Sequence, residues 1–187
     1  NSSATVEAMG NLSLAAGRID NLDAHFSTTV ARVSTEDKLE YSFGGLPYRY
    51  DISEVRFNHV LKDSVLNLVL LKEYDDGRWT SGEWFNEYRF IRTVDETQIV
   101  STDPGRILAG GNLLVEGDHL TNDKSRIIAG GRLLADVVNL ENIAATGLRP
   151  TADTGTVTDY WRKPDSGRDI QGKRRVDYIP APTIQTI

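Results

Sequence analysis

Arg106-Ile-Leu-Ala-Gly-Gly-Asn-Leu-Leu-Val115 decides the fold, because nearly the same stretch returns 20 residues later as Arg126-Ile-Ile-Ala-Gly-Gly-Arg-Leu-Leu-Ala135. Over the whole repeat, residues 106–125 and 126–145 are identical at nine of 20 positions. The shared residues are mainly apolar residues, the Gly-Gly pair and one asparagine. A fixed period of this length is typical of stacked structural repeats.

Within each repeat, apolar or small residues recur at every second position, as in Ile107 and Ala109 or Leu113 and Val115. A period of two predicts a strand with both residues on one face. Gly110-Gly111 suits the corner between two such strands, because glycine accepts backbone angles that other residues avoid. Three short strands and three corners predict one coil of a parallel β-helix, about 20 residues long, on which the next coil stacks.

A third copy lies near the start of the chain. With an offset of 101 residues, residues 6–21 match residues 107–122 without a gap, so that Val6 falls on Ile107. We therefore predict a first coil at residues 1–22 and two tandem coils at residues 105–145. Three asparagines share one position of the repeat and are predicted to stack as a ladder, each amide bonding the next; they are Asn21, Asn122 and Asn142. The alternative is that they are unrelated turn asparagines.

Residues 23–104 interrupt the coils with an insertion of 82 residues. Its β-rich runs, which include the alternating residues 51–62, lie on both sides of the turn signal Asp75-Asp76-Gly77 and predict antiparallel hairpins outside the coils. The insertion holds two of the three tryptophans and five of the seven tyrosines. These aromatic residues either form the core of a thin two-layer arm or expose a partner-binding patch. The candidates for such a patch are Trp79, Trp84 and Phe85.

Residues 146–182 predict a second hairpin arm around the turn Pro164-Asp165-Ser166-Gly167. This arm is basic within an acidic chain, with its cations clustered at residues 162–163 and 168–175. The cations either keep a solvated strand edge from pairing or form a ligand site. Residues 183–187 are a candidate for the start of a further coil.

The composition narrows the functional classes. The net charge of −6 argues against nucleic acid or an anionic membrane as the main partner. The chain has no cysteine, its three histidines are scattered, and it contains no nucleophile elbow, phosphate loop or zinc motif. We expect no catalytic residue, metal site or cofactor, and no membrane insertion by this segment. The absence of a signal peptide and the uncapped repeat at residue 1 favour an interior piece of a larger protein.

Here the repeats resemble a known family. Arg-Ile-(Leu/Ile)-Ala-Gly-Gly-x-Leu-Leu, closing on Leu-x-Asn, is similar to the haemagglutinin repeats of filamentous haemagglutinins, and Gln98 to Gly111 is similar to the sequence that precedes such repeats. These proteins form the two-partner-secreted family that includes the effectors of contact-dependent growth inhibition. The resemblance implies a right-handed β-helical shaft on the outside of a Gram-negative cell, exported by a dedicated outer-membrane transporter.

The sequence therefore predicts an all-β fold, with right-handed parallel β-helix coils interrupted by antiparallel hairpin insertions. The predicted function is a non-enzymatic shaft segment of a secreted adhesin or contact-dependent inhibition effector. Contact of the arms with a target-cell receptor is a hypothesis. One alternative is a dedicated receptor-binding module, and a remote one is a β-helical enzyme acting on polysaccharides. The family's Asn-Pro-Asn secretion motifs and a toxin signature are absent, so neither export recognition nor toxicity is assigned to this segment.

Overall fold

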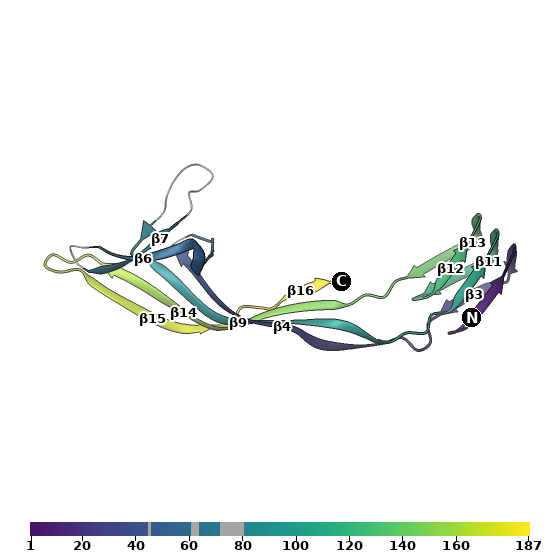
Figure 1. Ribbon diagram of the computed structural model, residues 1–187, viewed down its shortest axis with the longest axis horizontal. Coiled ribbons are helices and arrows are strands. Elements are labelled where there is room, and N and C mark those ends of the chain that lie inside the picture. Colours follow the sequence, from purple (N-terminus) through teal and green to yellow (C-terminus); the bar gives the residue numbers. More distant parts are fainter. Residues whose placement is uncertain (45, 61–63, 72–80) are drawn as a thin grey trace. The chain divides into compact units, whose positions relative to one another are not determined.

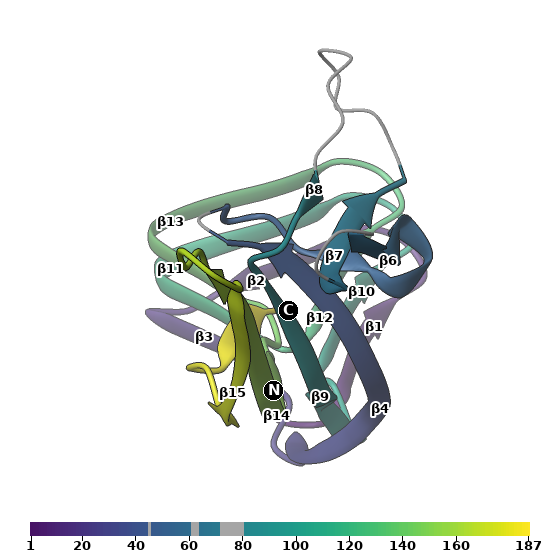
Figure 2. The ribbon, with the colours of Figure 1, turned by 90° about the vertical axis from the view of Figure 1, so that its left-hand side faces the viewer.

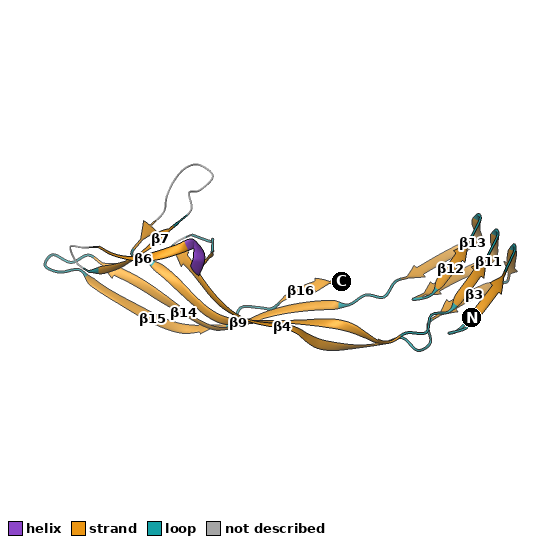
Figure 3. Ribbon diagram, in the orientation of Figure 1, coloured by secondary structure: helices purple, strands orange, loops and turns teal. Residues whose placement is uncertain are grey.

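The computed structural model describes residues 1–44, 46–60, 64–71 and 81–187, and these are mostly β-strand (Figure 3). The helix found among them is a three-residue 3-10 turn, η1 (Ile52–Glu54), with Asp51 as its N-cap. The predicted all-β class is confirmed. The chain divides into two compact units. We call Asn1–Ala31, Glu96–Arg149 and Thr186–Ile187 the parallel unit, and Arg32–Asp95 with Pro150–Gln185 the antiparallel unit.

The parallel unit contains three rungs built from equivalent parts of the repeat. The first rung consists of β1 (Thr5–Ala8), β2 (Leu12–Ala15) and β3 (Arg18–Leu22). The second consists of β10 (Arg106–Ala109) and β11 (Leu113–Asp123), and the third of β12 (Arg126–Ala129) and β13 (Leu133–Ile143). Figure 1 shows the strands of successive rungs lying side by side.

Pairing between rungs is parallel and follows the offsets of the sequence repeat. In a three-stranded sheet of order β1-β10-β12, Val6 pairs with Ile107, which pairs with Ile127. In a four-stranded sheet, β11 lies between β13 on one side and β2 and β3 on the other. The offsets of 101 and 20 residues therefore place equivalent side chains above one another.

The core of the parallel unit is the middle rung. Its five buried apolar residues are Ile107, Ala109, Leu113, Val115 and Leu120. Each is covered by its equivalent in both neighbouring rungs, whereas a residue of an outer rung is covered on one side. Leu120 is thus 3% exposed, and its third-rung equivalent Leu140 is 60% exposed. Burial of a leucine contributes about 1.5–3 kcal/mol, so the stack gains most from rungs with two neighbours.

The antiparallel unit is organised around a large sheet of order β15-β14-β9-β4-β5. Its long strands are β4 (Ser27–Phe43), β9 (Phe85–Ser101), β14 (Leu148–Lys163) and β15 (Ile170–Tyr178), and its far edge is the short β5 (Tyr50–Asp51). Figure 2 shows β15, β14, β9 and β4 side by side in this order. The candidate start of a further coil forms β16 (Thr183–Thr186), which pairs with β14.

A second, smaller sheet of order β6-β7-β8 completes the core of the antiparallel unit. It contains β6 (Val55–Val60), β7 (Val65–Leu70) and β8 (Ser81–Gly82). Apolar side chains of β6 and β7 pack against aromatic side chains of the large sheet, and the buried members of this cluster are Tyr41, Phe43, Val55, Leu68, Leu70 and Phe85. Two layers of strands with large side chains therefore bury this core.

Candidate partner-binding site

The three aromatic residues proposed for partner binding have different positions. Trp84 is 66% exposed, whereas the next residue, Phe85, is fully buried. The Phe85 ring stacks on Tyr160, with ring centroids 4.7 Å apart. Phe85 is therefore a core residue, because neighbouring residues of an extended chain point to opposite faces and its side chain is the one that meets the core. Trp79 lies outside the described residues.

Trp84 is held at the surface by close contact with Gly44. The Gly44 N–H donates to the Trp84 carbonyl oxygen over 2.8 Å. A Cβ atom at Gly44 would lie 2.8 Å from Cγ of the Trp84 ring, so a side chain there would displace the indole. The ring borders a hollow of about 490 Å³ that is also lined by Leu46 and Pro164. Trp84 thus offers a positioned, exposed aromatic surface.

An ion-pair network lies beside Trp84 at the end of the β14–β15 hairpin. The Arg162 guanidinium is 2.6 Å from a Glu83 carboxylate oxygen and also contacts Asp169. All three side chains are less than one-third exposed. Because the cation contacts two carboxylates, it ties the hairpin end to the segment after β8. This network therefore holds in place the residues that lie beside Trp84.

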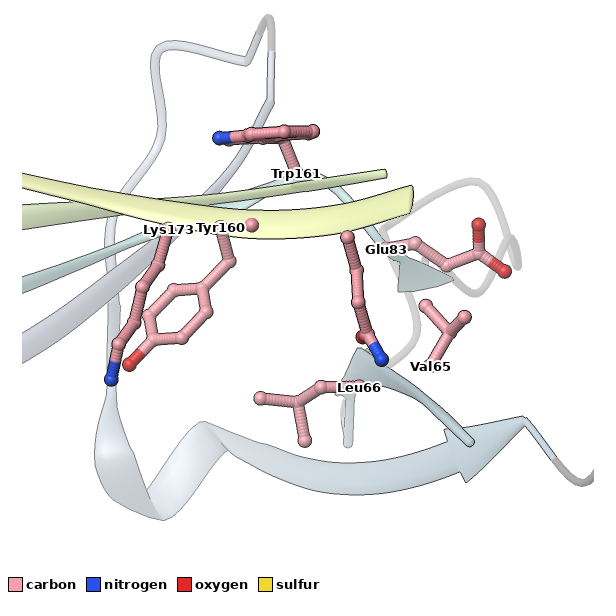
Figure 4. Close-up of a pocket in the computed structure, with 8 residues that line it drawn as sticks. Val65, Leu66, Glu83, Tyr160, Trp161 and Lys173 are labelled. Atoms are coloured by element: carbon pink, nitrogen blue, oxygen red, sulfur yellow. The ribbon is translucent and has the colours of Figure 1, made fainter. Parts of the chain in front are cut away.

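A second hollow, of about 230 Å³, lies beneath β15. It is lined by Val65 and Leu66 of β7, by Glu83, and by residues 160–161 and 171–173 of the β14–β15 hairpin. Figure 4 shows Tyr160, Lys173 and Leu66 around one space, with the Trp161 ring on the opposite side of the hairpin. Trp161 covers Gly172, where a Cβ atom would lie 2.3 Å from the indole. The two faces of this hairpin therefore present an open hollow and a flat aromatic ring.

The face of the large sheet that carries Trp161 also holds a group of charged and aromatic residues. The Arg49 guanidinium lies 4.0 Å from the ring centre of Tyr88 and 4.8 Å from that of Tyr178. Farther along, Arg92 binds both carboxylate oxygens of Asp153 over 2.8 Å. These cations are already partnered, so this group stabilises the sheet.

Tyr41 has the most perturbed hydroxyl of the core. Burial, followed by the nearby Glu87 carboxylate, raises the pKa of Tyr41 far above its usual value. The hydroxyl donates to a Glu87 carboxylate oxygen over 3.0 Å. Burial likewise raises the pKa of Tyr160. Both phenols therefore stay neutral at physiological pH.

The asparagines at the shared repeat position form a hydrogen-bonded ladder in the parallel unit. Asn21 Nδ2 donates to Asn122 Oδ1 over 2.8 Å, and Asn122 Nδ2 donates to Asn142 Oδ1 over 2.7 Å. Asn1 extends the ladder, since its Nδ2 donates to Asn21 Oδ1 over 2.6 Å. Residues 1–3 also pair alongside β3, through a parallel bridge between Ser2 and Leu22. Asn1 therefore occupies the ladder position of a preceding rung.

Asn21 and Asn122 also close the corner at the end of their rungs. Asn122 Nδ2 donates to the carbonyl oxygen of Ser125, three residues later. Asn21 Nδ2 donates to the equivalent carbonyl oxygen, that of Gly105, 84 residues later. Asp23 reinforces this second closure by accepting hydrogen bonds from the Thr102 hydroxyl and the Asp103 N–H. One side-chain bond thus spans a short corner in one rung and the whole insertion in another.

Among the residues with described positions, no group of three histidine, aspartate or glutamate side chains could hold a metal ion. Within the same ranges, no helix is both long and apolar enough for a membrane crossing. No family model, curated protein or solved structure matches the chain.

Sequence reasoning missed the hollow beneath β15 and the role of Trp161. The pairing of Trp161 with Gly172 follows from the hairpin register, in which Lys163 pairs with Ile170. The turn signal at residues 164–167 located this hairpin, but counting back from those four residues places Trp161 opposite Ile170, two residues from its true partner, because the connection in the structure spans residues 164–169. By contrast, Leu66 comes from a distant strand and had no local signal.

Proposed function

We propose that this chain is a non-enzymatic segment of a secreted cell-surface filament of the haemagglutinin-repeat type. In this proposal the rungs belong to a right-handed parallel β-helical shaft, and the antiparallel unit contacts a receptor on a target cell. The observation that carries the proposal is the in-register parallel pairing of residues 5–22, 106–123 and 126–143. Further rungs can be added to such a stack, because each rung presents its neighbour with the same pattern of hydrogen bonds and apolar side chains.

The hydrogen bond from Asn21 to the Gly105 carbonyl oxygen supports different roles for the two units. The two-residue corner Lys124-Ser125 is sufficient for Asn122 to reach the Ser125 carbonyl oxygen, so a rung does not need an insertion to close. Asn21 makes the same bond across an insertion that adds a second compact unit. Segments added to a complete scaffold often carry binding functions. We therefore assign contact to the antiparallel unit and length to the rungs.

Within the antiparallel unit, the exposed Trp84 and the two hollows favour the contact role. Aromatic residues that are both exposed and held in place lose little conformational entropy on binding and are frequent in protein interfaces. Trp84 meets both conditions, since its ring rests on Gly44 and remains mostly accessible. The alternative of a dedicated receptor-binding module has the same support. No observation favours the polysaccharide-active enzyme, so we do not propose it.

The family resemblance supplies the rest of the proposal. The parent protein would leave a Gram-negative cell through its outer-membrane transporter and remain at the cell surface or be secreted. The segment itself would bind neither nucleic acid nor cofactors, and it would not insert into a membrane. It would serve as part of an adhesin or of a contact-dependent inhibition effector.

The test deletes from the parent protein both segments that interrupt or follow the rungs. Residues 23–105 are replaced by Lys-Ser, which copies the corner Lys124-Ser125, and Gly147 is joined to Ile187 by a tight turn. The second junction is short, because Gly147 and Ile187 already exchange two backbone hydrogen bonds, of 2.8 and 3.0 Å. We expect export to continue and attachment to target cells to be lost. Unchanged attachment would overturn the contact role, and failure of the shortened protein to form protected rungs would overturn the shaft.

A further inference from the structure

Strand β15 forms a long open edge of the large sheet. Nine register pairs, from Gly155–Tyr178 to Lys163–Ile170, join it to β14. On its other side it has no partner among the strands that the structure describes. The opposite edge, β5, has two residues and offers little backbone for pairing. A long edge strand presents unpaired N–H and C=O groups, so β15 is the place where this sheet can accept another strand.

The β15 edge carries cations that are not neutralised locally. Lys173 and Arg175 are on one face of the strand, because residues two apart share a face. Neither forms an ion pair within the described part of the chain, whereas Arg174, on the other face, lies 3.5 Å from Asp159. The face of β15 that carries Lys173 and Arg175 also holds one carboxylate, Asp177, so its net charge is positive and favours an acidic strand over a second copy of this edge.

The hollow beneath β15 lies on the face that carries Lys173. Leu66 and Tyr160 supply its apolar part, and Gln171 and Lys173 line it from β15 itself (Figure 4). Side chains of an added strand would alternate between the two faces of the sheet. One of them would therefore point toward this hollow while its neighbours on the other face lie near Trp161 and Arg174. Strand addition with side-chain pockets at alternate positions is a general mode of peptide recognition.

We propose that the β15 edge binds an extended, acidic segment of a partner protein by strand addition. An apolar side chain of that segment fills the hollow beside Leu66 and Tyr160, and its carboxylates meet Lys173 and Arg175. The inference deepens the proposed function and rests on it only in taking the antiparallel unit as the contacting part.

The first test measures binding of a fluorescent peptide to the full chain. The probe has about ten residues, the length of a typical strand, with a leucine and the glutamates two residues before and after it on one face and threonines at the alternate positions. We expect saturable binding that weakens as salt is raised. The double variant Lys173→Glu with Arg175→Glu should lose at least about tenfold in affinity. The control, Lys163→Glu with Arg168→Glu, makes the same charge change outside the β15 edge and should lose less than about threefold.

The second test asks whether the peptide binds through its backbone. In an antiparallel or parallel pairing, alternate residues of the added strand direct their N–H groups toward the edge. Two probes are therefore N-methylated at alternate positions, in complementary registers. We expect one to lose binding and the other to keep it. Equal effects of the two, equal binding by the Lys173/Arg175 variant and the native chain, or no binding by the native chain would each overturn strand addition.

Two further measurements complete the design. Circular dichroism and hydrogen exchange in β14 verify that each variant is folded. Sedimentation of the chain alone should show no dimer that depends on the β15 edge, and such a dimer would overturn the assignment of an acidic partner. If the shortened parent protein fails to attach to cells while the peptide does not bind, the contact role stands and strand addition fails. If the peptide binds and attachment is unaffected by the deletion, β15 binds acidic strands but the proposed function fails.

Discussion

Replacing Asn21 by alanine tests the ladder at its most buried position. The Asn21 amide nitrogen donates to Asn122 Oδ1 over 2.8 Å and to the carbonyl oxygens of Arg126 and Gly105 over 3.1 and 3.3 Å. Its side-chain oxygen accepts a hydrogen bond from Asn1. A lost hydrogen bond costs about 1 kcal/mol, and a buried acceptor left unpaired costs about 1–3 kcal/mol. Since Asn21 is fully buried, we expect Asn21→Ala to destabilise the rungs by about 3 kcal/mol in total.

The matched control is Asn142→Ala, at the same repeat position in the third rung. Asn142 is exposed and accepts one hydrogen bond from the ladder, so we expect a loss of about 1 kcal/mol or less. The assay is hydrogen–deuterium exchange of β10 and β11, which reports on the parallel unit alone. Asn21→Ala should accelerate exchange of the most protected amides about 100-fold. Equal effects of the two variants would refute the reasoning, because burial would then not determine the contribution of a ladder residue.

Four further predictions concern other parts of the fold. Gly105→Ala should destabilise the rungs strongly, because its Cβ would lie 2.5 Å from Asn21 Oδ1, whereas Gly10→Ala, with nothing within 4 Å, should be tolerated in the same exchange assay. Phe85→Ala should lower the free energy of unfolding of the antiparallel unit by about 3–5 kcal/mol in urea, and Trp84→Ala by less than about 1 kcal/mol. Similar losses for the two variants would contradict the expectation that follows from the burial of Phe85 and the exposure of Trp84. Asp153→Asn, which breaks the paired contact with Arg92, should cost about 1–3 kcal/mol, while Arg174→Ala should change unfolding by less than about 0.5 kcal/mol. Arg32 lowers the pKa of Asp95. The stabilisation from this pair is therefore complete above the ordinary aspartate pKa of about 4 and is lost as pH falls through the lowered pKa. Asp95→Asn should reduce the loss of stability at acidic pH, measured by unfolding at a series of pH values.

Sequence reasoning predicted the parallel unit well, because repeated residues encode its pairing. Identical residues at offsets of 101 and 20 indicate which side chains occupy equivalent positions, and the structure pairs Val6, Ile107 and Ile127 in this register. The asparagines could be predicted in the same way. Register in a stack requires no information beyond the repeat, since each rung contacts its immediate neighbours.

The antiparallel unit was less predictable, because its contacts join distant segments that share no repeated pattern. β14 pairs with β9, so that Thr151 lies opposite Val94. The insertion after the first rung and the segment after the third rung therefore contribute to one sheet. Local periodicity cannot indicate such a partner. It also cannot decide which of Trp84 and Phe85 faces the core. The alternating stretch from Asp51 is interrupted by η1, although Asp51 and Glu54 form a capping box that the sequence could have indicated.

The central claim is that three stretches, distant in sequence, form one parallel stack in the register of the repeat. Nuclear Overhauser effects between backbone protons test it most directly. We expect contacts that connect Thr5–Ala8 to Arg106–Ala109, and Arg106–Ala109 to Arg126–Ala129, with Val6 opposite Ile107 and Ile127. Antiparallel contacts, or a register shifted by one residue, would contradict the account.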